Sequence, residues 1–256
     1  MQFGYNKRTG KRKDYKYWYF DDKTKMYYEC IKPSDYIVGL FPRNKNHPPK
    51  NRIMNCPWIN IHTGNHELIE TKDGVLFNKG GIIDKKEIDY FENFHFISLI
   101  NELINEITPR TSITVKVINK WHQRFLGQLY TWAGKYRTVD VSKYGFRWPS
   151  YNTIPNAMNN LNRFLISSTP ITSNELEEIL NIVSKIMGEL LFIHPFREGN
   201  GRITKLIGVI LLFQKNYPIL NFTNTSDTEW INASLDAYAQ DYTAIKGILR
   251  NALNEN

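Results

Sequence analysis

Residues 190–213 read LLFIHPFREGNGRITKLIGVILLF, a polar turn set between two apolar stretches. The apolar side chains on either side recur at three- and four-residue steps, which is typical of buried helix faces. We therefore expect helices at residues 173–193 and 201–215, joined by a loop. The two glycines of the turn lie two residues apart, as is common where the chain turns sharply into a helix.

The joining segment, His194–Arg202, gathers side chains of distinct chemistry. A Gly-Asn-Gly turn at a helix N-terminus directs several backbone N–H groups the same way and favours an anion. His194 can accept a proton near neutral pH, and Glu198 can hold a hard divalent cation. Asn200 and Arg202 can bind phosphate oxygens. Each residue alone is more often structural, but together they indicate phosphoryl or nucleotidyl transfer.

Apolar periodicity predicts further helices, with Thr114 capping one of them and Thr172 and Glu175 forming a capping box before residue 173. Trp121-His122 and His95 fall on apolar helix faces, where a packing role is expected. In residues 137–149, apolar and polar side chains alternate on either side of Gly145, and this pattern predicts a β-hairpin. The main domain should be all-α with one hairpin; its other helices are expected at residues 85–107, 115–126, 154–167, 228–240 and 243–253.

The first 60 residues differ in charge from the rest of the chain. They hold 13 Lys and Arg against 5 Asp and Glu, whereas the remainder holds 20 of each, and the whole chain carries +8. Aromatic-rich runs at residues 15–20 and 26–31 predict a short hairpin, and the proline-rich stretch 39–64 should be irregular. We expect a basic segment at 1–70 and the main domain at 71–256.

Composition also excludes several classes of protein. With 41% hydrophobic and 23% charged residues, the chain has an ordinary globular composition. Cys30 and Cys56 are too few for a disulfide framework, and no apolar run is long enough to cross a bilayer or to act as a secretory signal. We expect a cytoplasmic protein without a membrane partner, although an effector exported by a specialised secretion system would look the same.

The segment His194-Pro195-Phe196-Arg197-Glu198-Gly199-Asn200-Gly201-Arg202 resembles the signature of the Fic (filamentation induced by cAMP) family, His-x-Phe-x-Asp/Glu-Gly-Asn-Gly-Arg-x-x-Arg. Residues 126–143 resemble the stretch that leads into the family's target-docking flap, and residues 74–79 resemble the start of its fold. The resemblance covers about residues 74–253. It implies a Fic-fold helical bundle with a hairpin flap, and a protein adenylyltransferase that uses ATP and Mg²⁺.

The resemblance also implies a role for each motif position. His194 would deprotonate a Tyr, Ser or Thr hydroxyl of a target protein, whose oxygen attacks the α-phosphate of ATP. Glu198 would ligate Mg²⁺, and Phe196 would anchor the loop in the core. The nucleotide would be held by Phe196, Glu198, Gly199, Asn200, Gly201, Arg202 and Lys205, and the target would pair with a flap that includes Val139, Asp140, Val141, Ser142, Lys143 and Trp148.

Lys205 departs from the family pattern, which has a second arginine at this position. A lysine offers a point charge in place of a bidentate fork, so the grip on the γ-phosphate should be looser. Many family members are silenced by a Ser/Thr-x-x-x-Glu-Gly/Asn helix whose glutamate pairs with that arginine. Incomplete matches make Glu255 and Glu102 candidate inhibitory residues, but we favour a separate antitoxin-like partner or no such restraint.

Other functions stay open. Some Fic relatives transfer phosphate, UMP or phosphocholine, although they usually alter the Gly-Asn-Gly core, which is intact here. A non-catalytic protein could use its basic N-terminus to bind nucleic acid or an acidic surface, with Tyr15, Tyr17, Trp18 and Tyr19 available for stacking. Cys30, Cys56, His62 and His66 are a weak candidate zinc site, because the first spacing is far longer than usual.

Overall fold

A computed structural model of the chain describes residues 17–21, 26–30, 58–59, 65–143 and 145–254. By its contacts the chain divides into two units, residues 1–94 with 127–131 and residues 95–126 with 132–256. Helix α1 (Lys85–Glu106) runs from the first unit into the second. The described residues are mostly helical, with short strands in three antiparallel pairs. This confirms the expected all-α main domain.

The first unit contains two strand pairs. Strands β1 (Tyr17–Asp21) and β2 (Met26–Cys30) pair antiparallel, which confirms the predicted N-terminal hairpin. Strands β3 (Trp58–Ile59) and β4 (Glu70–Thr71) also pair. This pair was not predicted, because a strand of two residues is too short to show an alternation of apolar and polar side chains. Near the start of α1, the buried Asn78 donates to the carbonyls of Leu76 and Ile82 and fixes the intervening turn.

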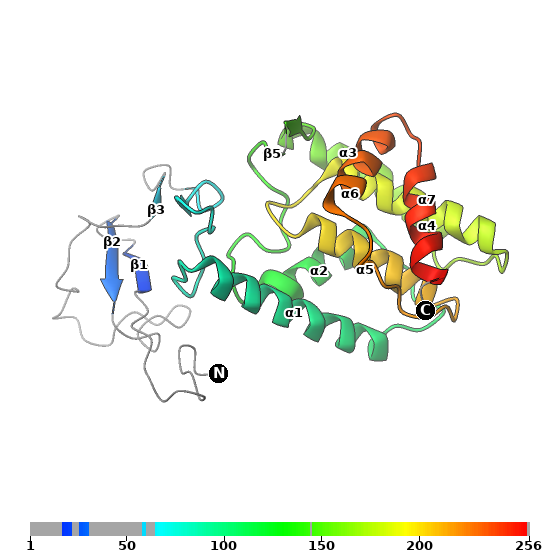
Figure 1. Cartoon of the computed structure of the whole chain (residues 1–256), viewed down its shortest axis with the longest axis horizontal. Coiled ribbons are helices and arrows are strands. Elements are labelled where there is room, and N and C mark those ends of the chain that lie inside the picture. Colours follow the sequence, from blue (N-terminus) through cyan, green and yellow to red (C-terminus); the bar gives the residue numbers. More distant parts are fainter. Residues whose placement is uncertain (1–16, 22–25, 31–57, 60–64, 144, 255–256) are drawn as a thin grey trace. The chain divides into compact units, whose positions relative to one another are not determined.

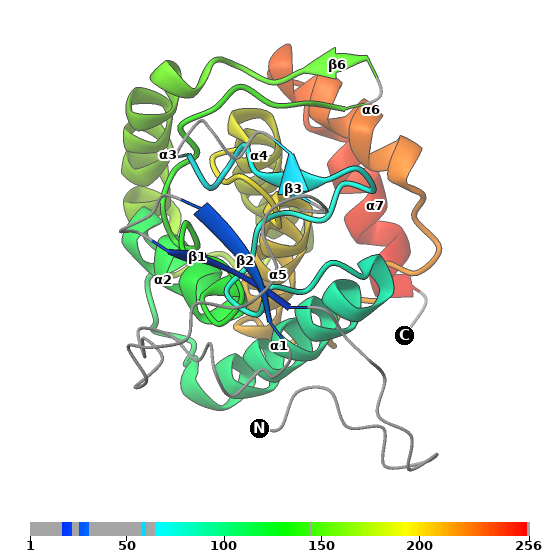
Figure 2. The ribbon, with the colours of Figure 1, turned by 90° about the vertical axis from the view of Figure 1, so that its left-hand side faces the viewer.

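The second unit is built around α4 (Leu176–Ile193). This helix contacts α3 (Ile154–Ser168), α5 (Asn200–Phe213), α6 (Asp227–Tyr238) and α7 (Thr243–Asn254). Figure 1 labels these helices, and Figure 2 shows α4 and α5 in yellow between α3 on one side and α6 and α7 on the other. Because neighbours surround α4, it buries apolar side chains on nearly all its faces.

Helix α2 (Val115–Leu126) packs against α3 and α5. Its apolar face buries Trp121, His122 and Phe125, and it is the face turned toward the rest of the unit. The Thr114 hydroxyl accepts the Val117 N–H at 3.3 Å, which confirms the predicted cap. The register of α2 therefore brings the His122 ring into the core near the start of α5.

The predicted central hairpin is also present. Strands β5 (Ser142–Lys143) and β6 (Phe146–Arg147) pair antiparallel, and Gly145 between them has a φ of 78°. Only glycine adopts this left-handed conformation without strain, so the position of the turn follows from the residue type. Residues 139–149 are called the flap below.

The capping box predicted at Thr172 and Glu175 is wrong. Helix α4 begins at Leu176 with Glu175 as its N-cap, and no side chain caps it. The Ser173 hydroxyl accepts the Glu175 N–H at 3.1 Å, and such local turns compete with helical backbone. A complete capping box instead starts α6, between Ser226 and Glu229.

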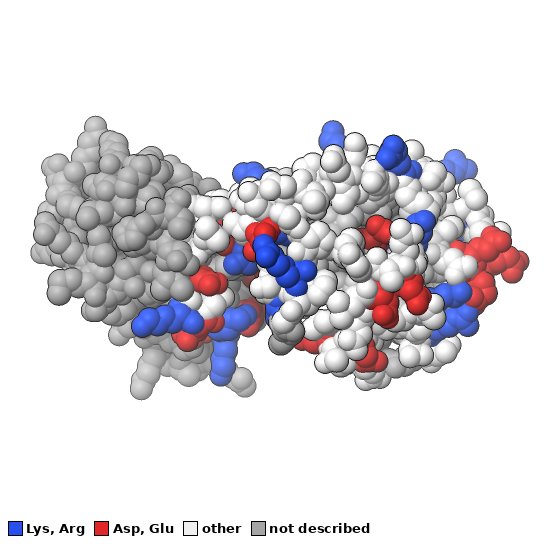
Figure 3. Space-filling view, turned by 90° about the horizontal axis from the view of Figure 1, so that it is seen from above, with Lys and Arg blue, Asp and Glu red and all other residues white. Residues whose placement is uncertain are grey.

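Charged side chains of both signs are interspersed over the described part of the face drawn in Figure 3. This mixture agrees with the balanced composition of the chain after residue 60. Among the described residues, none of the helices combines the length and the hydropathy needed to cross a bilayer.

Candidate functional site

The loop between α4 and α5 begins and ends in left-handed backbone. His194 caps the C-terminus of α4 with φ 50° and ψ 58°, and Gly199 caps the N-terminus of α5 with φ 82°. A non-glycine residue in this region is strained, and its conformation persists only where surrounding contacts hold it. The contacts around His194 therefore have to be strong.

The loop closes on itself through Phe196 and Asn200. The Asn200 side-chain oxygen accepts the Phe196 N–H at 2.9 Å, and its amide donates to the Phe196 carbonyl at 2.8 Å. Phe196 is fully buried and stacks on the His122 ring, with centroids 3.8 Å apart. The expected anchoring of Phe196 is confirmed. Both polar atoms of the Asn200 amide are engaged within the loop, so its contact with phosphate stays a prediction.

His122 ties this loop to α2. Its Nδ1 accepts the Gly134 N–H at 2.8 Å, so the ring proton lies on Nε2, which donates to the Glu198 carbonyl at 2.9 Å. Burial lowers the pKa of His122 to about 4, and the ring is therefore neutral at neutral pH. The expected packing role is confirmed by its full burial, but the sequence did not predict that His122 also orients the loop.

Glycine occupies positions 199 and 201 of the loop for different physical reasons. A Cβ on Gly199 would lie 3.1 Å from side-chain atoms of both Leu126 and Phe125, in a backbone that already disfavours side chains. A Cβ on Gly201 would meet no atom within 4 Å, and its φ is not in the left-handed region. The fold therefore requires glycine at 199, whereas at 201 it leaves open space on the first turn of α5.

The N-terminus of α5 is the expected anion site. No side chain caps it, and its first intrahelical bond runs from the Ile203 N–H to the Gly199 carbonyl. The N–H groups of the first turn have no partner within the helix, and the helix dipole makes this end positive. Backbone, open space and dipole together suit a phosphate group.

His194 presents one basic nitrogen. Its Nδ1 lies 3.3 Å from the Leu191 carbonyl, which can only accept, so Nδ1 carries the proton and Nε2 the lone pair. The Trp148 ring packs on the imidazole with centroids 4.0 Å apart. Burial, with a smaller contribution from the positive charges of Arg137 and Lys143, lowers the pKa of His194 to about 3, against the opposing effect of the hydrogen bond to Leu191. The ring is therefore neutral and can accept a proton at Nε2.

Charged side chains follow along the loop and the first turns of α5. The carboxylate of Glu198 accepts the Gly199 N–H at 3.0 Å and lies 3.9 Å from the Arg202 guanidinium. Arg202 lies over the Phe125 ring at 4.8 Å, and the Lys205 ammonium lies over the Trp230 ring at 4.9 Å. Burial lowers the pKa of Lys205, against an opposing effect of Asp227. Arg202 and Lys205 thus flank the helix start with positive charge.

The flap joins this site at its base. Asp140 pairs with Arg147 at 2.5 Å, and the Val141 carbonyl accepts the Trp148 N–H at 3.2 Å. The side chains of Ser142 and Lys143 are exposed, whereas Trp148 is buried against His194. Exposed strands next to the histidine suit the predicted docking of an extended segment, and Trp148 serves the histidine itself.

Sequence reasoning missed Arg137, a fully buried arginine that bonds to both the loop and the flap. It lies within the stretch 126–143 that resembles the family, but arginine is mostly exposed in proteins and nothing beside it signals burial. Only the fold brings residues 137 and 194 together.

The candidate inhibitory residues are not brought to the site by any described contact. Glu102 pairs with Arg124 at 2.5 Å, and Glu106 shares the same guanidinium. Glu255 lies outside the described residues. An inhibitory role for either glutamate stays a prediction.

The weak zinc candidate gains no support. Cys56 and His62 lie outside the described residues, and the His66 ring contacts the Thr131 hydroxyl at 3.2 Å. Within the described part of the chain, no three His, Cys, Asp or Glu side chains come together as metal ligands.

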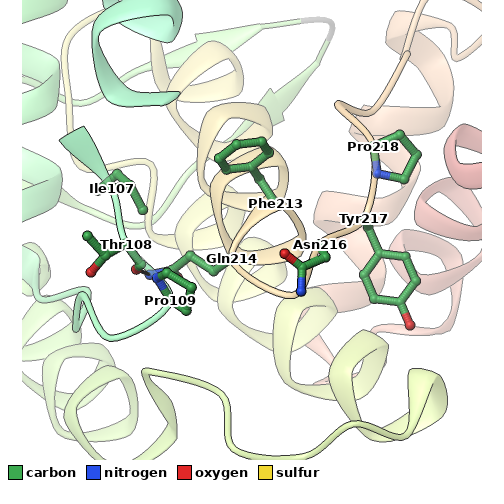
Figure 4. A pocket seen from close by; sticks show the side chains of 8 residues that line it. All are labelled: Ile107, Thr108, Pro109, Phe213, Gln214, Asn216, Tyr217 and Pro218. Atoms are coloured by element: carbon green, nitrogen blue, oxygen red, sulfur yellow. Dashed lines mark hydrogen bonds between the residues drawn. The ribbon is translucent and has the colours of Figure 1, made fainter. Parts of the chain in front are cut away.

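Two cavities lie away from the loop. One of about 480 Å³ is at the other end of α5, between the end of α1 and residues 213–218 (Figure 4). The other, of about 490 Å³, is lined by residues of α2, α3 and Tyr136. Neither cavity contains a residue of the loop.

Known proteins resemble this chain in sequence. Residues 112–212 match the Fic/DOC family. The protein adenylyltransferase VbhT of Bartonella schoenbuchensis is 28% identical over 195 residues, which are 75% of this chain and 40% of VbhT. The probable protein adenylyltransferase y4lH of Sinorhizobium fredii is 27% identical over 70% of this chain and 91% of its own length. The chain thus spans well under half of VbhT.

The fold is also known. The crystal structure of BepC, a VirB-translocated effector protein of Bartonella tribocorum with bound AMPPNP, is 18% identical and has a TM-score of 0.59. The match covers 69% of this chain and 91% of the BepC chain. It shows that the helical unit shares the BepC fold. The signature lies within residues 112–212, and these residues therefore form a domain of the Fic/DOC family.

Proposed function

We propose that this chain is a protein adenylyltransferase that moves AMP from ATP to a Tyr, Ser or Thr hydroxyl of a target protein. The observation that carries the proposal is the uncapped start of α5, which has open space at Gly201 and follows shortly after His194, whose Nε2 is basic. The names of VbhT and y4lH support AMP as the group transferred.

In the proposed reaction, His194 Nε2 takes the proton of the target hydroxyl. The hydroxyl oxygen then forms a bond to the α-phosphorus of ATP, and the bond from that phosphorus to the bridging oxygen breaks and releases pyrophosphate. A pKa of about 3 makes the ring a weak base in the free protein. The negative charge of a bound triphosphate would raise that pKa and favour proton transfer.

The phosphates would lie at the start of α5. The N–H groups of Gly201 and Arg202 and the guanidinium of Arg202 supply donors and positive charge there, and the Gly199 N–H would join them on leaving the Glu198 carboxylate. Lys205, in place of an arginine, would approach the γ-phosphate as a single charge, and its half-burial against Trp230 limits its reach. We expect weaker nucleotide binding than an arginine would give.

The residues present fit a magnesium ion bound together with the nucleotide. Mg²⁺ in nucleotide sites is commonly held by one or two carboxylates plus phosphate oxygens. Glu198 offers one partly exposed carboxylate beside the phosphate site. The ion would neutralise phosphate charge when it is bound.

Two alternatives follow from other features. The same site could transfer another phosphate-containing group, since its geometry does not identify the nucleotide. The basic segment 1–70 could bind nucleic acid, and its charge is the observation that favours this.

We further propose that the Fic domain extends over residues 71–256, that any inhibitor is a separate partner, and that the protein acts in the cytoplasm or as an exported effector.

The test is transfer of label from α-labelled ATP with Mg²⁺, in a lysate and in self-modification, with wild type and His194→Ala. We expect a labelled band in wild type that falls on the order of 10² to 10⁴-fold in the variant. His95→Ala, which removes a histidine of α1 outside the loop, is the matched control and should retain the label. If label were transferred only from γ-labelled ATP, the protein would transfer phosphate and not AMP.

A further inference from the structure

Arg137 is the buried arginine that the sequence did not reveal, and its side chain is 0% exposed. Its Nε donates to the His194 carbonyl at 2.8 Å. Its two terminal nitrogens donate to the carbonyls of Val139 at 2.7 Å and Pro149 at 2.6 Å. Its main-chain N–H donates to the Pro195 carbonyl at 2.8 Å. One residue thus bonds to the start of the loop and to both ends of the flap.

The guanidinium is suited to this junction because its donors point in three directions in one plane. Burying its charge removes hydration, and the three carbonyls replace that hydration. The Asp140 carboxylate lies 3.9 Å away, too far for a hydrogen bond. If the flap moved from the loop, the buried cation would lose two of its acceptors, so the flap and the loop should move together.

Trp148 makes a second connection between the same parts. Its ring packs on the His194 ring, and its Nε1 donates to the Leu191 carbonyl at 3.2 Å. The flap is therefore held against the end of α4 by Arg137 at its base and by Trp148 at its second strand. Both connections act on the residue whose backbone is strained, His194.

We propose that Arg137 is a positioning residue that sets the distance between a substrate segment held by the flap and Nε2 of His194. The proposal rests on the proposed function, because it takes the flap to hold a protein substrate. Displacement of reacting groups by about 1 Å can slow a reaction on the order of 10²-fold. Loss of the junction should therefore slow transfer to protein and leave nucleotide binding at α5 intact.

The first experiment compares Arg137→Lys with Arg163→Lys, a matched change at an exposed arginine of α3 that bonds only locally to Asn160. We expect Arg137→Lys to bind AMPPNP within about threefold of wild type while its transfer rate falls on the order of 10 to 10²-fold. Arg163→Lys should change neither. Equal losses of affinity and transfer, or unchanged transfer, would overturn the proposal.

Hydrogen exchange supplies a readout that does not need activity. In Arg137→Lys, exchange should rise in both the flap and residues 190–199, while peptides from α7 keep their wild-type protection. A rise in only one of the two segments contradicts the junction, and a rise everywhere shows a purely structural role. If wild type transfers no label, the proposed function fails, and exchange still decides whether Arg137 joins the two parts.

A measurement on wild type alone decides the case in which Arg137→Lys does not fold. The Arg137 amide and the Trp148 indole N–H both bond across the junction. If the flap and the loop separate as one event, NMR exchange should give the two groups the same opening equilibrium constant within a factor of about three. Constants that differ more than tenfold would overturn the proposal.

Discussion

Helices α5 and α6 begin in opposite ways. At α6, the Ser226 hydroxyl accepts the Glu229 N–H at 3.2 Å, and the Glu229 carboxylate accepts the Ser226 N–H at 2.7 Å. At α5, the capping position is Gly199 in left-handed backbone, and no side chain caps the helix. Each helix N-terminus leaves N–H groups without an intrahelical partner. At α6 a side chain accepts one of these groups, whereas no capping side chain does so at α5.

The difference separates residues that serve folding from residues that serve binding. Ser226 and Glu229 lower the free energy of the folded chain. The Gly199–Gly201 turn instead keeps side chains away from the positive end of α5, and Gly201 leaves space that nothing in the described chain fills. The open space at Gly201 points to a ligand because it lies at the uncapped N-terminus of α5.

The largest expected effect comes from Gly199→Ala. Its positive φ and the contacts at 3.1 Å with Leu126 and Phe125 should together destabilise the fold by about 2–4 kcal/mol. Gly74→Ala is the control, because Gly74 has a φ of 75° but nothing within 4 Å of the added carbon. It should cost about 1 kcal/mol from strain alone. Urea unfolding of both variants measures the difference, and equal costs would contradict a packing role for Gly199.

The next effect is on binding. Gly201→Val should lower the affinity for AMPPNP by about 10- to 100-fold, or about 1.4–2.8 kcal/mol, because the side chain enters the proposed phosphate space. Stability should change little, since an added Cβ at this position meets no atom within 4 Å. Gly247→Val on α7, where an added carbon also meets nothing within 4 Å, is the control and should leave affinity unchanged. Calorimetric titration measures both; equal affinities would place the phosphates elsewhere.

A smaller effect at α6 completes the comparison. Ser226→Ala should destabilise the fold by about 1 kcal/mol, the usual cost of losing a serine cap. Because α6 uses its cap for folding alone, AMPPNP affinity should stay within a factor of about two. Thermal unfolding with titration checks both, and a large loss of affinity would show that the two helix starts are not independent.

The sequence predicted most elements of the fold because their apolar periodicity is strong. The expected helix at 85–107 is α1 (Lys85–Glu106), and the expected helix at 115–126 has those bounds in the structure. The central hairpin was predictable from Gly145, whose φ is positive. Local pattern failed where two segments offered the same signal. Thr172 and Glu175 have the capping-box spacing, as do Ser226 and Glu229, but only the second pair forms one.

The loop motif and its possible chemistry were visible in nine consecutive residues. Its supports were not, because they come from distant positions. His122 contacts the carbonyl of a residue 76 positions away, and Arg137 contacts one 57 positions away. No periodicity encodes such contacts, and both residue types are usually solvated or only partly buried. The internal bonds of Asn200 are local, yet they were not predicted. A polar residue beside two glycines was interpreted as a phosphate ligand, whereas its side chain bonds to the backbone of Phe196.

The smallest effect concerns acid. Hydrogen bonds from the Ser226 main chain and hydroxyl hold the pKa of Glu229 below its ordinary value of 4.5. A depressed pKa in the folded chain means that the stabilisation by Glu229 is complete above pH 4.5 and is lost as pH falls through the folded pKa. Glu229→Gln should therefore lower the unfolding temperature at pH 6. The difference in unfolding temperature between the variant and wild type should become smaller as pH falls below 4.5. Thermal melts from pH 6 to 3.5 measure this, and Asp236→Asn, at the other end of α6, is the control. A gap that does not change with pH would mean that the α6 cap acts without its charge, and that the two helix starts differ in geometry but not in electrostatics.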